Sequence, residues 1–344
     1  MKGANRAEQE PNLTDKSANQ TTVTKPNLYE SQWPKSKTPK PRSLKLVSVG
    51  VTAAVAVGSI ALAAQQAQAF SALNVVNSLS SSGGVGVSKD ILYGDAPLQD
   101  LDMYYPKPLA QAMQSQQSIS NSYPMVVFVH GGSWESGSKE DYAFVGQSFA
   151  QAGYITAVIN YRKAPEHVYP DYVKDTAQAI AWSYDNAARF HANPQRLAVV
   201  GHSAGAFNMI AAVSNEDFLA TYGMKPSDIS AVVGIAGPYS YDFRKYGGSV
   251  AFAADATPDE VMPDRQIKGK QPPYLLLTAE NDKVVYDQNT IKMTQALKEF
   301  GATVENSEIK GASHATSIGA MASPLRWVND VRAQVLRYLD KELN

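Results

Sequence analysis

The fold is indicated by residues 196–213, which read RLAVVGHSAGAFNMIAAV. An apolar run typical of a buried strand leads into Gly201-His202-Ser203-Ala204-Gly205, and an apolar run of helical length follows. A turn this tight strains the backbone at its apex, so small residues are needed around Ser203. The helix that follows would direct free N–H groups and a partial positive charge toward the turn. We therefore expect Ser203 at a strand–turn–helix elbow, placed as a nucleophile.

Short apolar runs alternate with amphipathic runs on both sides of this elbow. This alternation predicts an α/β fold with a mostly parallel central sheet flanked by helices. Strands are expected at 101–105, 125–130, 154–160, 197–201, 231–236, 274–279 and 303–309. Helices are expected at 141–151, 171–189, 204–214, 289–300 and 324–339. The long connection 239–273 is rich in Pro, Asp and Gly, which predicts a small cap-like insertion.

Composition excludes several classes of function. The chain has 344 residues, a formal charge of -1 and 44% hydrophobic residues, so it can bury a large core but has no basic field for nucleic acid. It contains no cysteine, which excludes disulfides, thiol catalysis and thiolate metal sites.

The N-terminal part differs from the rest. Residues 1–43 are polar, basic and without apolar periodicity, and we expect them to be disordered. Residues 44–69 form a signal peptide or a membrane anchor: lysines precede an apolar run at 46–64, and Ala67-Gln68-Ala69 resembles a cleavage site. The moderate hydrophobicity of the run favours cleavage near Ala69. In either case residues 70–344, the expected catalytic domain, would be exported, as a secreted or periplasmic protein or on a membrane anchor. The Ser/Gly-rich residues 71–86 are expected to be a flexible lead-in.

A second motif, His130-Gly131-Gly132-Ser133-Trp134, directly follows an expected strand. Glycines let the backbone approach a substrate closely, so the N–H of Gly131 or Gly132, together with that of Ala204, would form an oxyanion hole. We expect His130 to pack beneath this loop. Trp134 would either wall a substrate pocket or anchor the loop by packing.

A serine nucleophile needs a base, and the order Ser…acid…His leaves His314, the one histidine that follows the elbow. The others have simpler explanations: His202 packs or tunes the elbow, His191 caps a helix, and His167 lies in a loop. The acid is expected at Asp282, after the apolar strand 274–279. Glu280 is a weaker rival, and Asp287 is explained as a helix N-cap. The acidic residues of the insertion are expected to be solvated surface charges, namely Asp242, Asp255, Asp259 and Asp264.

Together these motifs resemble the α/β-hydrolase superfamily, and more narrowly the carboxylesterases that include feruloyl-esterase-like, hormone-sensitive-lipase-like and arylformamidase-like proteins. The resemblance covers about residues 90–340 and extends to Leu101-Asp102-Met103-Tyr104-Tyr105-Pro106 and Asn160-Tyr161-Arg162-Lys163-Ala164-Pro165-Glu166. The loop reads Gly-Gly-Ser-Trp, where hormone-sensitive-lipase-like esterases usually carry three glycines. This departure favours the feruloyl-esterase-like or formamidase-like branch.

The resemblance implies a serine carboxylesterase that acts on a small-molecule ester, with no metal or organic cofactor. An amidase or arylformamidase with the same three residues is the first alternative, and a serine peptidase is less favoured. A non-catalytic binding protein of the same fold is the alternative from another class. The acyl chain, the alcohol and the oligomeric state are left open by the sequence.

Overall fold

The computed structural model describes residue 73 and residues 75–119, 122–246 and 248–344, all of which lie in one compact unit. The expectations for residues 1–69 fall outside these described residues. Among the helices that are described, none combines the length and the hydropathy needed to cross a membrane.

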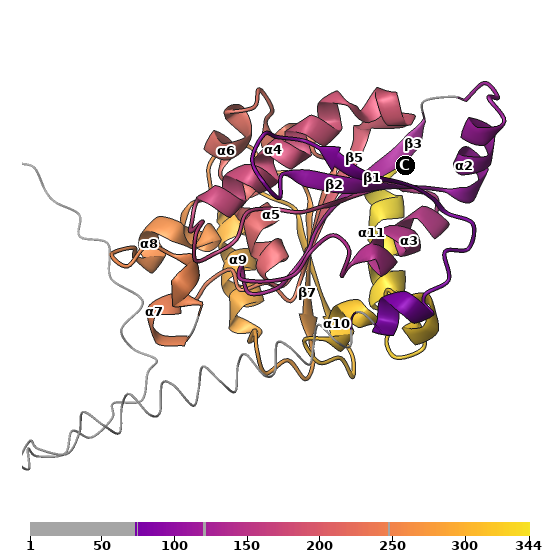
Figure 1. The fold of residues 1–344 in the computed structure, drawn as a ribbon. Helices are drawn as coiled ribbons and strands as arrows, with labels where there is room; N and C mark the ends of the chain where they lie inside the picture. The colour runs from indigo at the N-terminus through magenta and orange to yellow at the C-terminus, as the bar shows by residue number, and fades with distance from the viewer. Residues whose placement is uncertain (1–72, 74, 120–121, 247) are drawn as a thin grey trace, which may run out of the picture. The chain divides into compact units, whose positions relative to one another are not determined.

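The described chain folds around a sheet of eight strands, in the order β1-β2-β4-β3-β5-β6-β7-β8 (Figure 1). Strands β3 to β8 run parallel to one another, whereas β2 runs antiparallel to both of its neighbours, β1 and β4. Their bounds are Gly86–Leu92 (β1), Asp100–Tyr105 (β2), Tyr123–Val129 (β3), Ile155–Ile159 (β4), Ala192–His202 (β5), Ala231–Ile235 (β6), Tyr274–Ala279 (β7) and Val304–Ile309 (β8).

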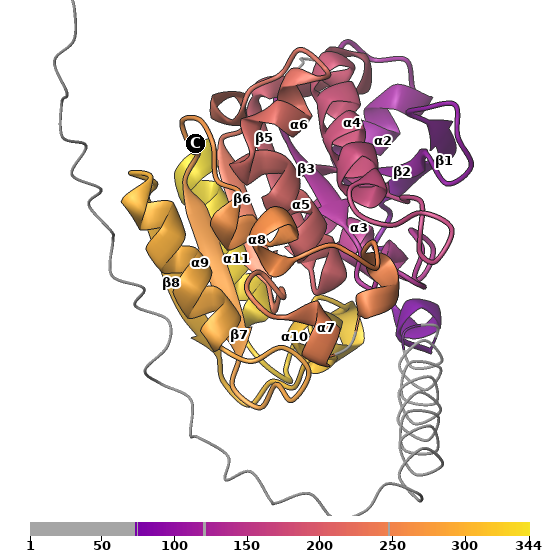
Figure 2. The same cartoon turned by 90° about the vertical axis from the view of Figure 1, so that its left-hand side faces the viewer.

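Helices connect the strands and cover both faces of the sheet (Figure 2). The longer ones are Lys107–Gln114 (α2), Ala143–Gln151 (α3), Asp171–Asp185 (α4), Ala204–Ser214 (α5), Gln288–Glu299 (α9) and Val331–Leu343 (α11). The shorter ones are Glu216–Ala220 (α6), Phe243–Tyr246 (α7), Pro258–Val261 (α8) and Thr316–Gly319 (α10). Single 3-10 turns occur at Ala187–Phe190 (η1), Pro226–Asp228 (η2), Ser249–Ala251 (η3), Pro263–Arg265 (η4) and Ser323–Leu325 (η5).

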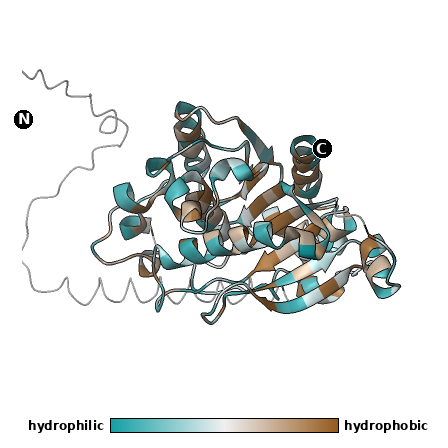
Figure 3. Ribbon diagram, turned by 90° about the horizontal axis from the view of Figure 1, so that it is seen from above, coloured by the Kyte–Doolittle hydropathy of each residue, from teal (hydrophilic) through white to brown (hydrophobic). Residues whose placement is uncertain are grey.

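Alternation along the central strands divides the core between the two sheet faces. In β3, Val127 packs in the cluster that contains α4, α5 and α9, whereas Val126 and Phe128 pack in the cluster that contains α3 and α11. Strands covered on both faces must be apolar at almost every position, and β3, β4 and β6 meet that requirement. The central strands are accordingly brown in Figure 3.

The α/β-hydrolase arrangement expected from the sequence is confirmed, with several local differences. The expected helix at 324–339 is wrong at its start, because η5 and a turn precede α11. The lead-in expected to be flexible is docked over its described part: residues 75–79 are helical, and the Asn77 side chain bonds the backbone of Glu140, Asp141 and Phe144. Strand β1 and helix α2 were not expected.

The cap-like insertion 239–273 contains α7, η3, α8 and η4 and packs beside α4 and α5. Phe252 stacks on Phe243 and contacts Trp134, so the insertion supports the loop that follows β3. Asp264 is not the solvated charge expected from the sequence: its side chain is 11% exposed, and burial raises the pKa of its carboxyl.

Candidate active site

Ser203 lies between the end of β5 and the start of α5, so the free backbone N–H groups of the first helical turn are next to it. Its φ of 54° and ψ of -125° place it in a strained region for a non-glycine residue. The neighbours must be small because the chain passes so close: a Cβ on Gly201 would lie 2.7 Å from the carbonyl oxygen of Gly205, and one on Gly205 would lie 2.2 Å from that of Val129. The elbow expected from the sequence is therefore present.

Three side chains from distant parts of the sequence meet at this elbow. The Oγ of Ser203 lies 2.8 Å from Nε2 of His314, and Nδ1 of His314 lies 2.7 Å from Oδ2 of Asp282. A carboxylate only accepts hydrogen bonds, so Nδ1 carries the proton and leaves Nε2 free to accept the serine proton. This arrangement can deprotonate an attacking hydroxyl.

The carboxylate of Asp282 is fixed on both oxygens. Oδ1 accepts hydrogen bonds from the backbone N–H groups of Val284 (2.8 Å) and Val285 (2.9 Å), while Oδ2 faces His314. Burial disfavours the charge, but the hydrogen bonds outweigh burial and hold the pKa of Asp282 below its ordinary value. The carboxyl is therefore ionised at neutral pH and can stabilise an imidazolium.

The rival acids lie elsewhere. Glu280 is exposed and accepts a hydrogen bond from the N–H of Gly311, while pairing with Lys310. Asp287 precedes α9, but its side chain makes no capping hydrogen bond, so the capping explanation inferred from the sequence is wrong. Neither carboxylate contacts a histidine in the described part of the chain.

The loop after β3 brings backbone N–H groups to the elbow. A Cβ on Gly131 would lie 3.0 Å from Cβ of Ser203, and one on Gly132, which has a φ of 134°, would lie 2.1 Å from the carbonyl oxygen of Ser136. Only glycine fits at position 132, and a side chain at position 131 would crowd Ser203 and His202. The N–H groups of Gly132 and Ala204 donate no backbone hydrogen bond among the residues that the structure describes, so both are available to a ligand, whereas the N–H of Gly131 faces the hydroxyl of Tyr142.

His130 packs beneath this loop. Its ring stacks between Tyr142 and Tyr161, at centroid distances of 5.8 and 4.5 Å, and its Nδ1 lies 2.7 Å from the carbonyl oxygen of Gly131. Burial lowers the pKa of His130 to about 3, so the ring is neutral.

Trp134 acts as an anchor of the loop. Its ring is 3% exposed, is surrounded by Tyr172, Phe207 and Phe252, and its Nε1 donates a hydrogen bond of 2.8 Å to Asn208. Packing of this kind agrees with the second of the two expected roles, the loop anchor, and a contact of Trp134 with substrate stays a prediction.

The other histidines have separate roles. His202 is buried, with Nε2 at 3.3 Å from both the carbonyl oxygen of His314 and Oγ of Ser317. His191, at a φ of 65°, ends η1 through its backbone N–H, and His167 pairs with Asp171 on the half-exposed start of α4.

Two residues of the site environment were missed in the sequence. Ser317 donates a hydrogen bond of 2.7 Å to the carbonyl oxygen of His314 and so supports its loop. Lys139 is 2% exposed at its side chain and contacts carboxylates of Asp102, Asp90 and Glu140, just after the glycine loop. No pattern marks either residue, because a lysine in a polar loop ordinarily predicts a solvated surface.

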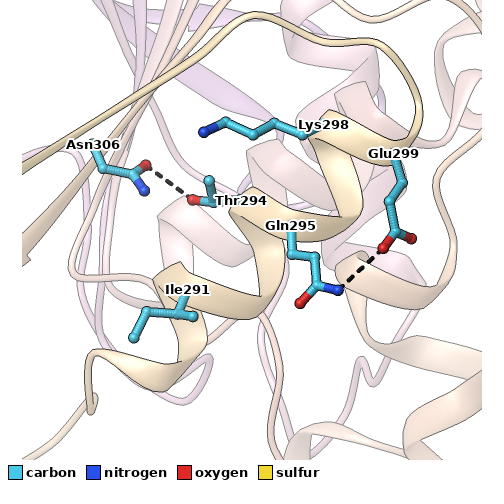
Figure 4. Close-up of a pocket in the computed structure, with 6 residues that line it drawn as sticks. All are labelled: Ile291, Thr294, Gln295, Lys298, Glu299 and Asn306. Carbon is cyan, nitrogen blue, oxygen red and sulfur yellow. Dashed lines mark hydrogen bonds between the residues drawn. The ribbon is translucent and has the colours of Figure 1, made fainter. Parts of the chain in front are cut away.

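Other sites are absent from the described residues or lie apart from this one. No cluster of three His, Asp or Glu side chains suited to a metal ion occurs within residues 75–119, 122–246 and 248–344. Figure 4 shows a shallow hollow along α9, where Thr294 bonds Asn306 and Gln295 bonds Glu299, and it contains none of the residues discussed above.

The model of the BD-FAE family matches residues 111–297, more than half of the chain and a span that includes Ser203 and Asp282. The chain belongs to the BD-FAE family. This membership places it among the esterase-like members of the α/β-hydrolase superfamily, which agrees with the resemblance found in the sequence.

Individual relatives agree with the family. Esterase LipC of Mycobacterium tuberculosis is 28% identical over 257 residues, which cover 68% of this chain and 61% of that protein. Isoprenylcysteine alpha-carbonyl methylesterase ICME of Arabidopsis thaliana is 27% identical over 269 residues, which cover 71% of this chain and 60% of that protein. The chain thus spans about three fifths of the length of these relatives.

Solved structures of the same fold include other esterases. Esterase B of Lactobacillus rhamnosis superposes with a TM-score of 0.67 at 16% identity, over 82% of this chain and 95% of that chain. A bacterial heroin esterase superposes with a TM-score of 0.63 at 18% identity, over 81% of this chain and 91% of that chain. At these identities the likeness supports the fold of this BD-FAE protein.

Proposed function

We propose that this protein is a serine carboxylesterase that hydrolyses small carboxylic esters, with short acyl or aryl groups, through an acyl-enzyme on Ser203. The observation that carries the proposal is the continuous chain of contacts from Ser203 through His314 to Asp282, with the free N–H groups of Gly132 and Ala204 in the glycine loop and at the elbow. The esterase names of the relatives favour an ester over an amide substrate.

The first half of the reaction makes the acyl-enzyme. Ser203 Oγ attacks the ester carbonyl carbon while Nε2 of His314 takes the hydroxyl proton, and Asp282 stabilises the imidazolium. The N–H groups of Ala204 and of Gly131 or Gly132 bind the oxyanion as it forms. Collapse of the tetrahedral intermediate breaks the bond to the alcohol, which leaves with the proton from His314.

The second half regenerates the enzyme. Water attacks the acyl carbonyl while His314 again accepts the proton, and the oxyanion is held by the same N–H groups. Collapse releases the carboxylic acid and returns the proton to Ser203. Removal of one oxyanion donor typically lowers kcat about 100- to 1,000-fold, so these amides carry a large share of the rate.

The test compares two serine variants on a panel of p-nitrophenyl esters. Ser203→Ala should reduce hydrolysis to the uncatalysed rate and abolish labelling by a fluorophosphonate. Ser230→Ala, at the amino end of β6 and away from the elbow, should retain both. Full hydrolysis by Ser203→Ala would overturn the proposal. Faster turnover of N-formylkynurenine than of every ester in the panel would replace the ester by an amide.

A further inference from the structure

A group of exposed apolar residues lies where the described chain begins. Val75 and Leu79 occupy one side of a helical turn and are 56% and 65% exposed, and Trp327 is 83% exposed. Arg326 adjoins Trp327, and both line a shallow hollow together with Lys310 and Arg332. We call these six residues the Trp327 face.

Hydrogen bonds join the two parts of this face. The N–H of Ser81 donates to Oγ of Ser323 at 3.1 Å, and Gln151 links Ser81 to Arg326 through its amide group. Val76, in the same helical turn, packs against the core. The turn of residues 75–79 lies beside α10 in both views (Figures 1 and 2). Val75, Leu79 and Trp327 are thus held on a fixed surface.

Three basic residues and one acidic residue, Asp330, line the hollow of this face. Among the residues that the structure describes, no carboxylate lies within ion-pair distance of Arg326 or Arg332; their guanidinium groups bond Gln151 and Ser148 instead. Burial lowers the pKa of both arginines, and the charge of Arg326 lowers the pKa of Arg332 further. Lys310 is already paired with Glu280 and Glu308. Two unpaired guanidiniums beside an exposed indole suit an anionic, partly apolar partner.

The face borders the edge of the sheet that holds the candidate active site. Lys310 directly follows β8, and the Asn329 side chain donates a hydrogen bond of 2.9 Å to the carbonyl oxygen of Thr316, in the helix that follows His314. A partner bound to the face would therefore lie close to the proposed reaction.

The sequence indicates which partner is near. The apolar run 46–64 ends ten residues before Val75, and ten extended residues span at most about 36 Å. The membrane anchor is one of the two alternatives inferred for this run; if the run is retained in a bilayer, it would hold the face within that distance of the lipid surface. Tryptophan and aliphatic side chains prefer the headgroup region, where basic residues also meet lipid phosphates.

We propose that the Trp327 face binds a lipid bilayer with anionic headgroups, with Val75, Leu79 and Trp327 at headgroup level and Arg326 and Arg332 against the phosphates. Such docking holds the candidate active site next to the membrane, where amphiphilic esters concentrate. This inference does not depend on the proposed esterase activity, because the contact can be measured without a substrate.

The absence of cysteine allows a direct test on the full chain. Single cysteines are introduced as Leu79→Cys, Trp327→Cys and, as a control, Phe300→Cys, a half-exposed residue at the end of α9. Each variant is labelled with a nitrobenzoxadiazole dye and inserted into nanodiscs of phosphatidylcholine, with or without phosphatidylglycerol. Spin-labelled lipid then quenches any dye that touches the bilayer.

In discs that contain phosphatidylglycerol we expect quenching at 79 and 327 and none at 300. Arg326→Gln or Arg332→Gln, in the Trp327→Cys chain, should lower the ratio of docked to undocked protein about fivefold each. An unquenched label at 327 would overturn the proposal, since the N-terminal tether alone explains contact at 79. Equal quenching without phosphatidylglycerol would overturn the role of the arginines. If both labels become shielded from solvent when the protein concentration is raised without lipid, the face binds a second copy of the chain and the proposal is overturned.

Discussion

The imidazole of His202 lies 5.1 Å from that of His314, and its Nε2 is 3.3 Å from the carbonyl oxygen of His314. A carbonyl oxygen only accepts, so Nε2 of His202 carries a proton and donates it. The residue next to the candidate nucleophile therefore holds the backbone of the candidate base. This contact joins two loops that are more than 100 residues apart in the chain.

We predict that His202 positions His314. His202→Leu removes the donor and should lower kcat about 10- to 100-fold with little change in KM, because a small displacement of a catalytic group costs rate. His202→Gln should restore part of the loss, since its amide can donate to the same carbonyl. The pH profile of kcat should shift in His202→Leu, which a purely structural defect would not produce. His167→Gln, in the half-exposed turn before α4, serves as the control and should keep full activity.

Stability should fall in mild acid because two buried histidines must stay neutral. Burial, and for His202 also the nearby His314, lowers the pKa of His130 and His202 to about 3. The unfolded chain binds these protons near pH 6.5, so each histidine contributes stability that is lost as pH falls below about 6.5, by up to about 1.4 kcal/mol per pH unit. Urea unfolding at a series of pH values measures this slope. His202→Gln should flatten it by up to one proton, and an unchanged slope would contradict the assignment.

Lys139 should be a major determinant of stability. Its buried ammonium lies 2.8 Å from Asp102, whose side chain is 1% exposed, and 3.3 Å from Asp100. Lys139→Met would leave Asp102 buried and without its cation, and should cost about 3–5 kcal/mol in the free energy of unfolding. Lys341→Met removes an exposed lysine that also contacts two carboxylates, and should cost far less, because solvent screens exposed ion pairs. Equal losses of unfolding free energy in the two variants would contradict the prediction that burial makes the Lys139 ion pairs more important than exposed ones.

The choice of acid can be decided by two matched substitutions. Asp282→Asn preserves size but removes the charge and favours the wrong tautomer of His314; the equivalent change in the Ser-His-Asp template lowers kcat about 10,000-fold. Asp287→Asn alters an exposed carboxylate five residues away, with no contact to His314, and should leave kcat unchanged. A loss confined to Asp287→Asn would move the acid to that position.

The sequence predicted the centre of this molecule better than its margins. Buried parallel strands must be apolar throughout, so β3, β4, β6 and β7 are visible as runs, and the small residues around Ser203 are required by the elbow. Strand β1 reads Gly-Val-Ser-Lys-Asp-Ile-Leu, half exposed, and lacks such a run. Helix α2 is only eight residues long and buries only Leu109, so little in the sequence marks it as part of the core.

The remaining differences depend on tertiary contacts that local patterns do not contain. Lys139 and Asp264 lie in polar stretches of sequence that ordinarily predict exposed charges, and only tertiary contacts bury them. The choice between the two roles of Trp134 depended on Phe252 and Asn208, which lie far away in the sequence. The catalytic roles of Ser203, His314 and Asp282 stay predictions, now with a geometry that suits them.

The two margins of the sheet have a consequence for assembly. Strand β1 forms one margin with Lys89 and Asp90, and β8 forms the other with the exposed Glu305 and Glu308. Charged side chains on edge strands disfavour pairing with a strand of another molecule. Neither edge strand favours the addition of a strand from a second molecule, so we expect any self-association of this domain to use side-chain surfaces. We also expect the folded protein to resist conversion into cross-β aggregates at high concentration.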